Sequence, residues 1–282
     1  MKILITGYKG MLGFDLVNKL KEDHELILTD IEQLDITNLK EVKEMISQEN
    51  LEAVINVAAY TDVDGCETNR ELAYSVNSTG PKNLAIACKE NDVTLLHIST
   101  DYVFPGNNTK PYREEDETGP QSYYGETKLQ AEEFIKEEME KFFIIRTAWL
   151  YGINGKNFVK TMLNLAKNNP EIRVVNDQRG SPTFTVDLAN AICELIETDK
   201  YGIYHVTNTD DCTWYDFAKN IFELANVEIE VKPVTTDEYP TPAKRPKYSV
   251  LSHEKWNNAG FKPLRTYEDA LKSYMELELS NE

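Results

Sequence analysis

The chain has 282 residues, of which 41% are hydrophobic, enough for one large α/β domain or a cofactor domain with a smaller companion. Its net charge of -18 excludes the basic surface that a nucleic acid or an anionic membrane requires. Four separated cysteines form no C-x-x-C pair, which predicts reduced thiols and neither a disulfide framework nor a zinc site. The N-terminus enters a strand without a signal peptide, and no apolar run reaches membrane-spanning length, so we expect a soluble, cytoplasmic protein.

In the first half of the chain, short apolar runs alternate with amphipathic stretches, which is typical of βαβ units and a parallel sheet. We predict strands at 2–6, 25–29, 53–56, 94–99 and 142–147. Helices are expected near 10–21, 39–49, 72–90, 124–141, 158–167, 186–197, 214–225 and 267–279. Three prolines in residues 236–246 exclude a regular helix and predict an ordered surface loop.

A glycine-rich turn follows the first predicted strand, with the sequence T-G-Y-K-G-M-L-G at residues 6–13. Its glycines permit a tight turn and a close approach of the backbone to a pyrophosphate, and the N–H groups at a helix start favour the anion. An acidic residue, Asp30, ends the second strand, as in dinucleotide-binding units. The spacing G-x-x-G-x-x-G is that of the short-chain dehydrogenase/reductase pattern. We therefore predict a dinucleotide site.

Asp30 is placed to accept hydrogen bonds from the adenosine ribose, and its charge would repel a 2′-phosphate. NADH is therefore the predicted cofactor, with NADPH also possible because Lys9 lies in the glycine loop. Asp35 either contacts the adenine or caps the next helix. Small residues after the third strand would let a cofactor pass over the backbone. The predicted cofactor-binding residues are Gly7, Gly10, Met11, Leu12, Gly13, Asp30, Leu34, Asp35, Ile36, Ala58, Ala59 and Tyr60, together with Tyr124 and Lys128.

The catalytic candidates are Tyr124 and Lys128, because residues four apart on a helix share a face. A neighbouring ammonium stabilises a phenolate and brings its proton transfer closer to the working pH. A second Tyr-x-x-x-Lys match occurs at Tyr215. Tyr124 is favoured because it follows a strand that ends in Ser99 and Thr100, whose hydroxyls reach the carboxyl end of the sheet. Those two side chains alternate, so only one can join the site.

Further motifs extend this pattern along nearly the whole chain. They are N-x-A-A-Y-T at 56–61, S-T-D-Y-V-F at 99–104, Y-G-x-T-K at 124–128, R-T-x-W-x-Y-G at 146–152, D-Q-x-G-S-P-T at 177–183 and R-P at 245–246. Together with the glycine turn, they resemble the extended short-chain dehydrogenases/reductases and, within them, the dTDP-4-dehydrorhamnose reductase family. The resemblance implies an α/β fold, a modified Rossmann doubly wound parallel sheet with a smaller C-terminal α/β substrate domain. We expect residues 1–150 to form the dinucleotide-binding domain and 151–282 mainly the substrate domain, with segments around 174–200 returning to the first.

The resemblance also implies an activity, the NAD(P)H-dependent reduction of the C4 keto group of dTDP-4-dehydro-L-rhamnose. Thr100, Tyr124 and Lys128 would then form a catalytic triad. Tyr124 would protonate the C4 oxygen, Lys128 would also hold the nicotinamide ribose, and Thr100 would orient the carbonyl. The residues that match substrate-binding positions of the family are Thr61, Val63, Asp101, Tyr102 and Trp149. For the substrate diphosphate, we consider Arg179 and Arg245 the candidate cations in an acidic protein.

Two other functions stay open from the sequence. One is a sugar-nucleotide epimerase or dehydratase of the same superfamily; the other is a non-catalytic subunit resembling the regulatory beta subunit of methionine adenosyltransferase. Some relatives dimerise around a divalent metal near the position of Asp15, but this chain has F-T-V at 184–186, so we predict no metal site. We expect a monomer or homodimer that binds a dTDP-sugar, with neither nucleic acid nor membrane as a partner.

Overall fold

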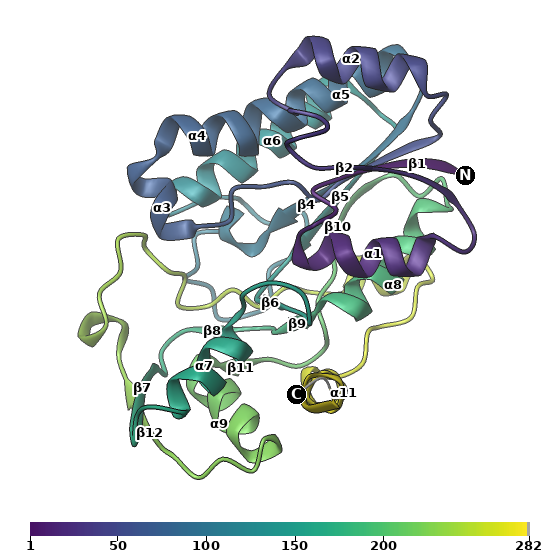
Figure 1. Ribbon diagram of the computed structural model, residues 1–282. Helices are drawn as coiled ribbons and strands as arrows, with labels where there is room; N and C mark the ends of the chain where they lie inside the picture. Colours follow the sequence, from purple (N-terminus) through teal and green to yellow (C-terminus); the bar gives the residue numbers. More distant parts are fainter. Residues whose placement is uncertain (281–282) are drawn as a thin grey trace.

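The computed structural model describes residues 1–280 and is organised around a six-stranded sheet (Figure 1). All neighbouring strands pair in parallel, in the order β10-β5-β4-β3-β1-β2. The strands are β1 (Lys2–Thr6), β2 (Glu25–Thr29), β3 (Ala53–Asn56), β4 (Thr94–Thr100), β5 (Phe142–Thr147) and β10 (Gly202–His205). The apolar sequences of β1 and β3 follow from this position, because a parallel sheet is covered on both faces.

Helices cover both faces of this sheet, which confirms the predicted doubly wound α/β class (Figure 1). On one face, α1 (Met11–Leu20) packs against α8 (Thr185–Ile196). On the other face lie α2 (Leu39–Gln48), α5 (Gly80–Glu90) and α6 (Tyr123–Glu138). Each helix turns an apolar stripe toward the strands. The core therefore consists of two apolar layers, one on each face of the sheet.

Some elements differ from the sequence predictions. The helix expected at 72–90 is α4 (Arg70–Tyr74), a π-helical turn at Ser75–Thr79 and then α5. Pro81 near the start of α5 lacks the N–H that a continuous α-helix would use there, which accounts for the interruption. The helix expected at 124–141 ends at Glu138, because Met139 is extended and buried. Neither the short helix α3 (Val63–Thr68) nor α10 (Glu254–Asn258) was predicted.

The C-terminal part packs around a third, aromatic-rich core (Figure 1). Its helices are α7 (Phe158–Ala166), α9 (Trp214–Leu224) and α11 (Tyr267–Ser280). Its paired strands are β6 (Leu150–Tyr151) with β9 (Thr183–Phe184), β7 (Glu171–Val175) with β12 (Glu230–Val234), and β8 (Arg179–Gly180) with β11 (Cys212–Thr213). The chain returns to the large sheet through α8 and β10; the domain division near residue 150 stays a prediction.

The proline-containing segment 236–246 holds only a 3-10 turn at Thr236–Glu238 and no α-helix. All four cysteines are free thiols; Cys66, Cys88 and Cys212 are buried, and Cys193 is partly exposed. Within residues 1–280, every helix is too short or too polar to cross a membrane.

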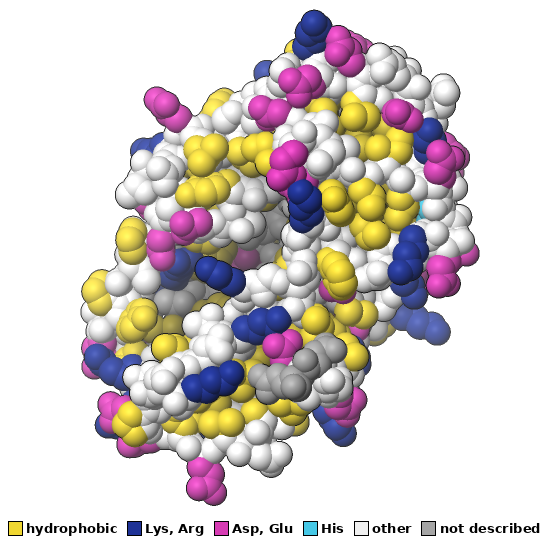
Figure 2. All heavy atoms as spheres, in the orientation of Figure 1, with side chains coloured by type: hydrophobic (Ala, Val, Ile, Leu, Met, Phe, Trp, Pro, Cys, Tyr) yellow, Lys and Arg dark blue, Asp and Glu magenta, His cyan; other side chains and the backbone are white. Residues whose placement is uncertain are grey.

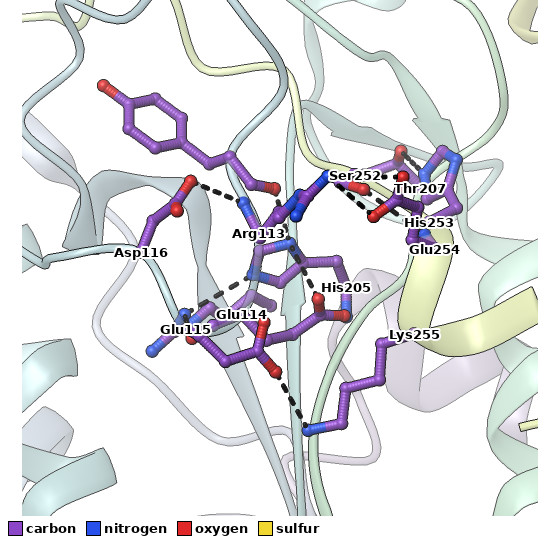
Figure 3. Close-up of polar contacts among 12 residues, drawn as sticks. Arg113, Glu114, Glu115, Asp116, His205, Thr207, Ser252, His253, Glu254 and Lys255 are labelled. Atoms are coloured by element: carbon purple, nitrogen blue, oxygen red, sulfur yellow. Dashed lines mark hydrogen bonds and ion pairs between the residues drawn. The ribbon is translucent and has the colours of Figure 1, made fainter. Parts of the chain in front are cut away.

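The segment before α6 is anchored to the end of the sheet by polar contacts (Figure 3). The carboxylate of Glu114 accepts the backbone N–H of His205 on β10 at 2.8 Å. Arg113 pairs with Glu254 at 3.1 Å, and Lys255 pairs with Glu115 at 3.9 Å. These contacts fix the connection that leads from the end of β4 to the start of α6, where the catalytic candidates lie.

Candidate active site

A cavity of about 410 Å³ opens at the carboxyl ends of β1, β2 and β3. Figure 2 shows the surface of this side hollowed between the two halves of the molecule, with Lys and Arg side chains beside the hollow. The structure brings most of the predicted cofactor residues together here; those that line the cavity are Gly7, Gly10, Asp30, Leu34, Asp35, Ile36, Ala58, Ala59 and Tyr60. The further lining residues, which were not among the predicted cofactor residues, are Thr6, Ile31, Thr37, Val57, Leu72 and Val76.

The glycine loop has the geometry that a dinucleotide needs. Gly7 has a φ of +71°, and a Cβ on it would lie 2.8 Å from the backbone of Ala58, so a side chain would fill the cradle. Gly10 begins α1 without a side-chain cap, which leaves the N–H groups of the first turn available to an anion. This arrangement fits the diphosphate of a nicotinamide dinucleotide.

Three predicted cofactor residues lie behind this cradle and do not line the cavity. Leu12 is buried in the core under the sheet, and Gly13 packs against the backbone of the glycine loop. Met11 lies against Gly152. Because the three residues belong to the first turn of α1, only their backbone is near the cradle, and their cofactor role stays a prediction.

The acidic residues of the cavity have distinct local roles. Asp30 accepts the backbone N–H of Ile31 at 2.9 Å and lines the cavity. Asp35 accepts the N–H and the hydroxyl of Thr37 at 2.9 and 2.7 Å. The cap of α2 is Asn38, so the alternative in which Asp35 caps that helix is wrong.

Thr100 and Tyr124 meet beside this cavity, at the junction of β4 with α6. A Cβ on Gly125 would overlap the carbonyl oxygen of Tyr102, so glycine at this position lets α6 approach the end of β4 closely. Burial and the nearby charge of Asp101 raise the pKa of Tyr124, while hydrogen bonding to Thr100 partly offsets the rise. The expectation that Lys128 brings this pKa closer to the working pH is therefore wrong for the cofactor-free structure, in which the phenol is neutral and can act as a proton donor.

Lys128 lies one turn along α6 and is fully enclosed. Its Nζ donates to the carbonyl oxygen of Ile98 at 2.6 Å and lies 3.1 Å from Nε2 of His97. Burial lowers the pKa of Lys128 to about 8. The sequence analysis assigned no role to His97.

Ser99 and Thr100 separate as the strand alternation predicts. The hydroxyl of Ser99 donates to buried Glu132 at 2.5 Å. The hydroxyl of Thr100 instead donates to Asp101 at 2.9 Å, on the side of Tyr124. Burial raises the pKa of Asp101 to about 6, while hydrogen bonding to Ser249 and Thr100 partly offsets the rise.

Tyr102 and Arg245 extend the site toward the C-terminal part. The ring of Tyr102 meets that of Tyr124 edge to face, with centroids 5.7 Å apart. Nη1 of Arg245 donates to the Tyr102 hydroxyl at 3.1 Å, and Nη2 pairs with Asp64 at 2.8 Å. The structure thus brings one of the two candidate cations to the catalytic residues, through an acidic partner that the sequence did not reveal.

The remaining substrate candidates are more scattered. Trp149 has a φ of +49° and stacks on Trp214 with ring centroids 3.5 Å apart. Arg179 forms an ion pair with Asp211. Thr61 is exposed, and Val63 begins α3. Their substrate-binding roles stay predictions.

The second Tyr-x-x-x-Lys match has a different setting. Tyr215 and Lys219 lie on α9 in the C-terminal part, and Nζ of Lys219 sits 5.4 Å from the Tyr215 ring centroid. This is a cation–π contact on a helix that packs against the aromatic core. Tyr215 therefore has a packing environment distinct from that of Tyr124.

Asp15 does not belong to a carboxylate cluster. Its Oδ2 accepts the hydroxyl of Thr185 at 2.5 Å. Among residues 1–280, no three His, Cys, Asp or Glu side chains gather in a way that could hold a metal ion.

Comparisons with known proteins extend over nearly the whole chain. The family model described as "RmlD substrate binding domain" matches residues 1–279. The chain is 42% identical to the spore coat polysaccharide biosynthesis protein SpsK of Bacillus subtilis, with 98% of this chain and 97% of that protein covered.

Two solved structures superpose closely on the model. The crystal structure of a dTDP-4-dehydrorhamnose reductase from Clostridium acetobutylicum has a TM-score of 0.96 and 48% identity, and the match covers 98% of this chain and 99% of the other. A dTDP-4-dehydrorhamnose reductase from Bacillus anthracis, solved in complex with NADP, has a TM-score of 0.96 and 42% identity at the same coverage.

Proposed function

The chain belongs to the RmlD substrate-binding-domain family, and we propose that it reduces the C4 keto group of dTDP-4-dehydro-L-rhamnose with NAD(P)H. The observation that carries the proposal is the placement of Thr100, Tyr124 and Lys128 beside a cavity that fits a dinucleotide. A neutral buried phenol next to a hydroxyl donor suits the protonation of a carbonyl oxygen.

The reaction adds a hydride and a proton across the C4 carbonyl. The bound reduced nicotinamide supplies the hydride when it is present. Tyr124 gives its phenolic proton to the C4 oxygen, and the product is the alcohol. The Thr100 hydroxyl, which donates its one proton to Asp101 in the cofactor-free structure, turns that proton to the carbonyl oxygen and orients the carbonyl. Lys128 holds the nicotinamide ribose and stabilises the phenolate left on Tyr124, which then regains a proton from solvent.

The substrate occupies the side of the site that faces the C-terminal part. Asp101 supports this placement, because its carboxylate lies next to the hydroxyl of Thr100 and can accept a sugar hydroxyl. Arg245 and Arg179 each pair with an aspartate, Asp64 and Asp211 respectively. Arg245 is the better placed cation for the diphosphate, since its guanidinium also contacts Tyr102, whose ring meets that of Tyr124.

The function is tested by following NADPH and NADH consumption with a panel of nucleotide-linked 4-keto-6-deoxyhexoses. We expect one cofactor to be oxidised for each dTDP-L-rhamnose formed from dTDP-4-dehydro-L-rhamnose. Conversion of a sugar without net cofactor oxidation would instead identify an epimerase. Tight cofactor binding without turnover on any member of the panel would identify a binding subunit.

Cofactor choice gives a separate prediction. Asp30 lines the cavity, and Lys9 is held by Glu32 at 2.5 Å, so the carboxylate and not the lysine faces the adenosine ribose. We expect NADH to be used at least as well as NADPH. Asp30→Ala removes the repulsion of a 2′-phosphate and should shift the ratio of kcat/KM values toward NADPH by about tenfold.

The control for this experiment is Asp23→Asn, which removes an equal charge from an exposed position outside the cavity. Its ratio of kcat/KM values should match that of the unmodified chain. A strong preference for NADPH in the unmodified chain would contradict the role given to Asp30 and transfer it to Lys9.

A further inference from the structure

A row of buried polar side chains crosses the sheet beneath the cofactor cavity and ends at Lys128. Thr6, Asn56 and His97 stand at the same level of three adjacent strands, β1, β3 and β4. Lys128 reaches His97 from α6. None of the four residues is more than 2% exposed. Because these side chains are buried, each must find its hydrogen-bond partners within the protein.

The amide of Asn56 fixes the direction of the hydrogen bonds. Its Oδ1 accepts the backbone N–H of Ala58 at 3.2 Å and the hydroxyl of Thr6 at 2.6 Å. A backbone N–H can only donate, so this end of the amide must be the oxygen. The Nδ2 end then donates to Nδ1 of His97, 2.9 Å away. His97 is consequently unprotonated at Nδ1, and its neutral ring carries the proton on Nε2.

That proton points at Lys128, because Nε2 lies 3.1 Å from Nζ. A lysine ammonium has three donors and no acceptor, so it would place hydrogen against hydrogen. A neutral amine has a lone pair that accepts from His97, while one of its own N–H groups donates to Ile98 at 2.6 Å. We infer that His97 is a positioning residue that holds Lys128 as a neutral amine in the cofactor-free protein at mildly alkaline pH.

The charges around Lys128 are compatible with this state. Glu132, one turn further along α6, raises the pKa of Lys128, but its carboxylate is bound by Arg146 of β5 at 2.7 Å. Tyr124, one turn earlier, is neutral, and Asp101 at the end of β4 acts on that phenol. Burial lowers the pKa of Lys128 and holds the pKa of His97 well below its ordinary range. Both directions agree with the hydrogen-bond pattern.

Cofactor binding changes the balance between the amine and ammonium forms of Lys128. A nicotinamide dinucleotide is anionic and presents ribose hydroxyls that accept hydrogen bonds, which favours the ammonium form. Lys128 then turns from His97 toward the ribose and takes up a proton from solvent. This second step rests on the proposed function, whereas the tautomer of His97 and the neutral amine do not.

The resting state is tested by NMR on the full-length, cofactor-free protein. Nitrogen-15 shifts should show His97 protonated on Nε2, and carbon-13 at Cε of Lys128 should titrate near pH 8. His97→Phe removes the donor and should raise that midpoint by about one unit or more. His97→Gln should retain it, because its carbonyl accepts from Asn56 while its amide N–H donates to Lys128.

The control is His253→Gln, which replaces a half-buried histidine that instead contacts Thr207 at 2.8 Å and should leave the midpoint unchanged. A proton on Nδ1 of His97, or an imidazolium, would overturn the inference even if the phenylalanine variant does not fold. Equal midpoints in His97→Phe and the unmodified chain would also overturn it.

The linkage between cofactor binding and proton uptake by Lys128 is measured by calorimetric titration with NADPH in buffers of different ionisation enthalpy. We expect an uptake of close to one proton at about pH 9 that disappears at about pH 6. Uptake that does not vary with pH would overturn the linkage. Absence of ketosugar reduction would overturn the proposed function and leave the NMR results standing, so the two failures are distinguishable.

Discussion

Replacement of Tyr124 by phenylalanine is expected to lower turnover by about two to four orders of magnitude while the fold stays intact. The phenyl ring retains its edge-to-face contact with Tyr102, so packing is conserved. Only the hydroxyl beside Thr100 is lost, and with it the proton that the C4 oxygen requires. The measurement is kcat for NAD(P)H oxidation, with thermal unfolding to verify that the variant is folded.

The matched control is Tyr215→Phe, which removes a phenol from the other Tyr-x-x-x-Lys pair. Because Tyr215 packs on α9 with Lys219, its loss should change kcat little. Thr100→Val should lower turnover but largely spare cofactor affinity, since its hydroxyl faces the phenol and Asp101. A folded Tyr124→Phe protein that oxidises NADH at nearly the unmodified rate would refute the mechanism.

The parts of the site that the sequence predicts are those with local patterns. The glycine turn is defined by residues that follow one strand, and the pair of Tyr124 with Lys128 by one turn of helix. The strand end that holds Ser99 and Thr100 was found because strand ends of a parallel sheet share one edge, and the choice of Thr100 came from the family resemblance. The glycine turn and the helical pair need only the period of a single element, and the structure has those elements at the predicted places.

The contacts that were missed depend on pairings between distant segments. Asp64 and Arg245 are 181 residues apart in the chain, and neither residue type by itself indicates which residue it pairs with. Asn56 ends β3, whereas His97 lies in the middle of β4, and neither position by itself indicates a polar partner. Only the parallel register that sets Thr6 opposite Asn56, and Asn56 opposite His97, makes them one row. Polar residues at the same level of several neighbouring apolar strands are the signal that would have revealed it.

Strands in the C-terminal part escaped prediction for a related reason. β6, β8, β9 and β11 have two residues each, too few to show an alternating pattern. The sixth strand of the large sheet, β10, has four residues and is defined by its pairing with β5. Its position follows from α8, which returns the chain to the helix layer beside α1.

Arg146→Leu is expected to cost about 3–5 kcal/mol of unfolding free energy, the largest stability effect that we predict. The guanidinium forms two bonds to Glu132, from Nε at 2.9 Å and from Nη2 at 2.7 Å, and both side chains are almost wholly buried. Nη1 also donates to the carbonyl oxygen of Glu114 at 3.2 Å and lies 3.4 Å from Nε2 of His205. Removing the arginine leaves the carboxylate without a counter-charge in the core. Urea denaturation measures the difference.

The double variant Arg146→Leu/Glu132→Leu separates the charge from the packing. Burying one unpaired charge costs far more than replacing both charges with apolar side chains of similar volume, so the double variant should be more stable than Arg146→Leu. Ser99 keeps the recovery incomplete, because its hydroxyl loses the Glu132 oxygen that it bonds at 2.5 Å. A double variant less stable than Arg146→Leu would show that the polar contacts, and not the unpaired charge, dominate the loss. Because Ser99 precedes Thr100 on β4, the pair also supports the strand end that presents the catalytic hydroxyl.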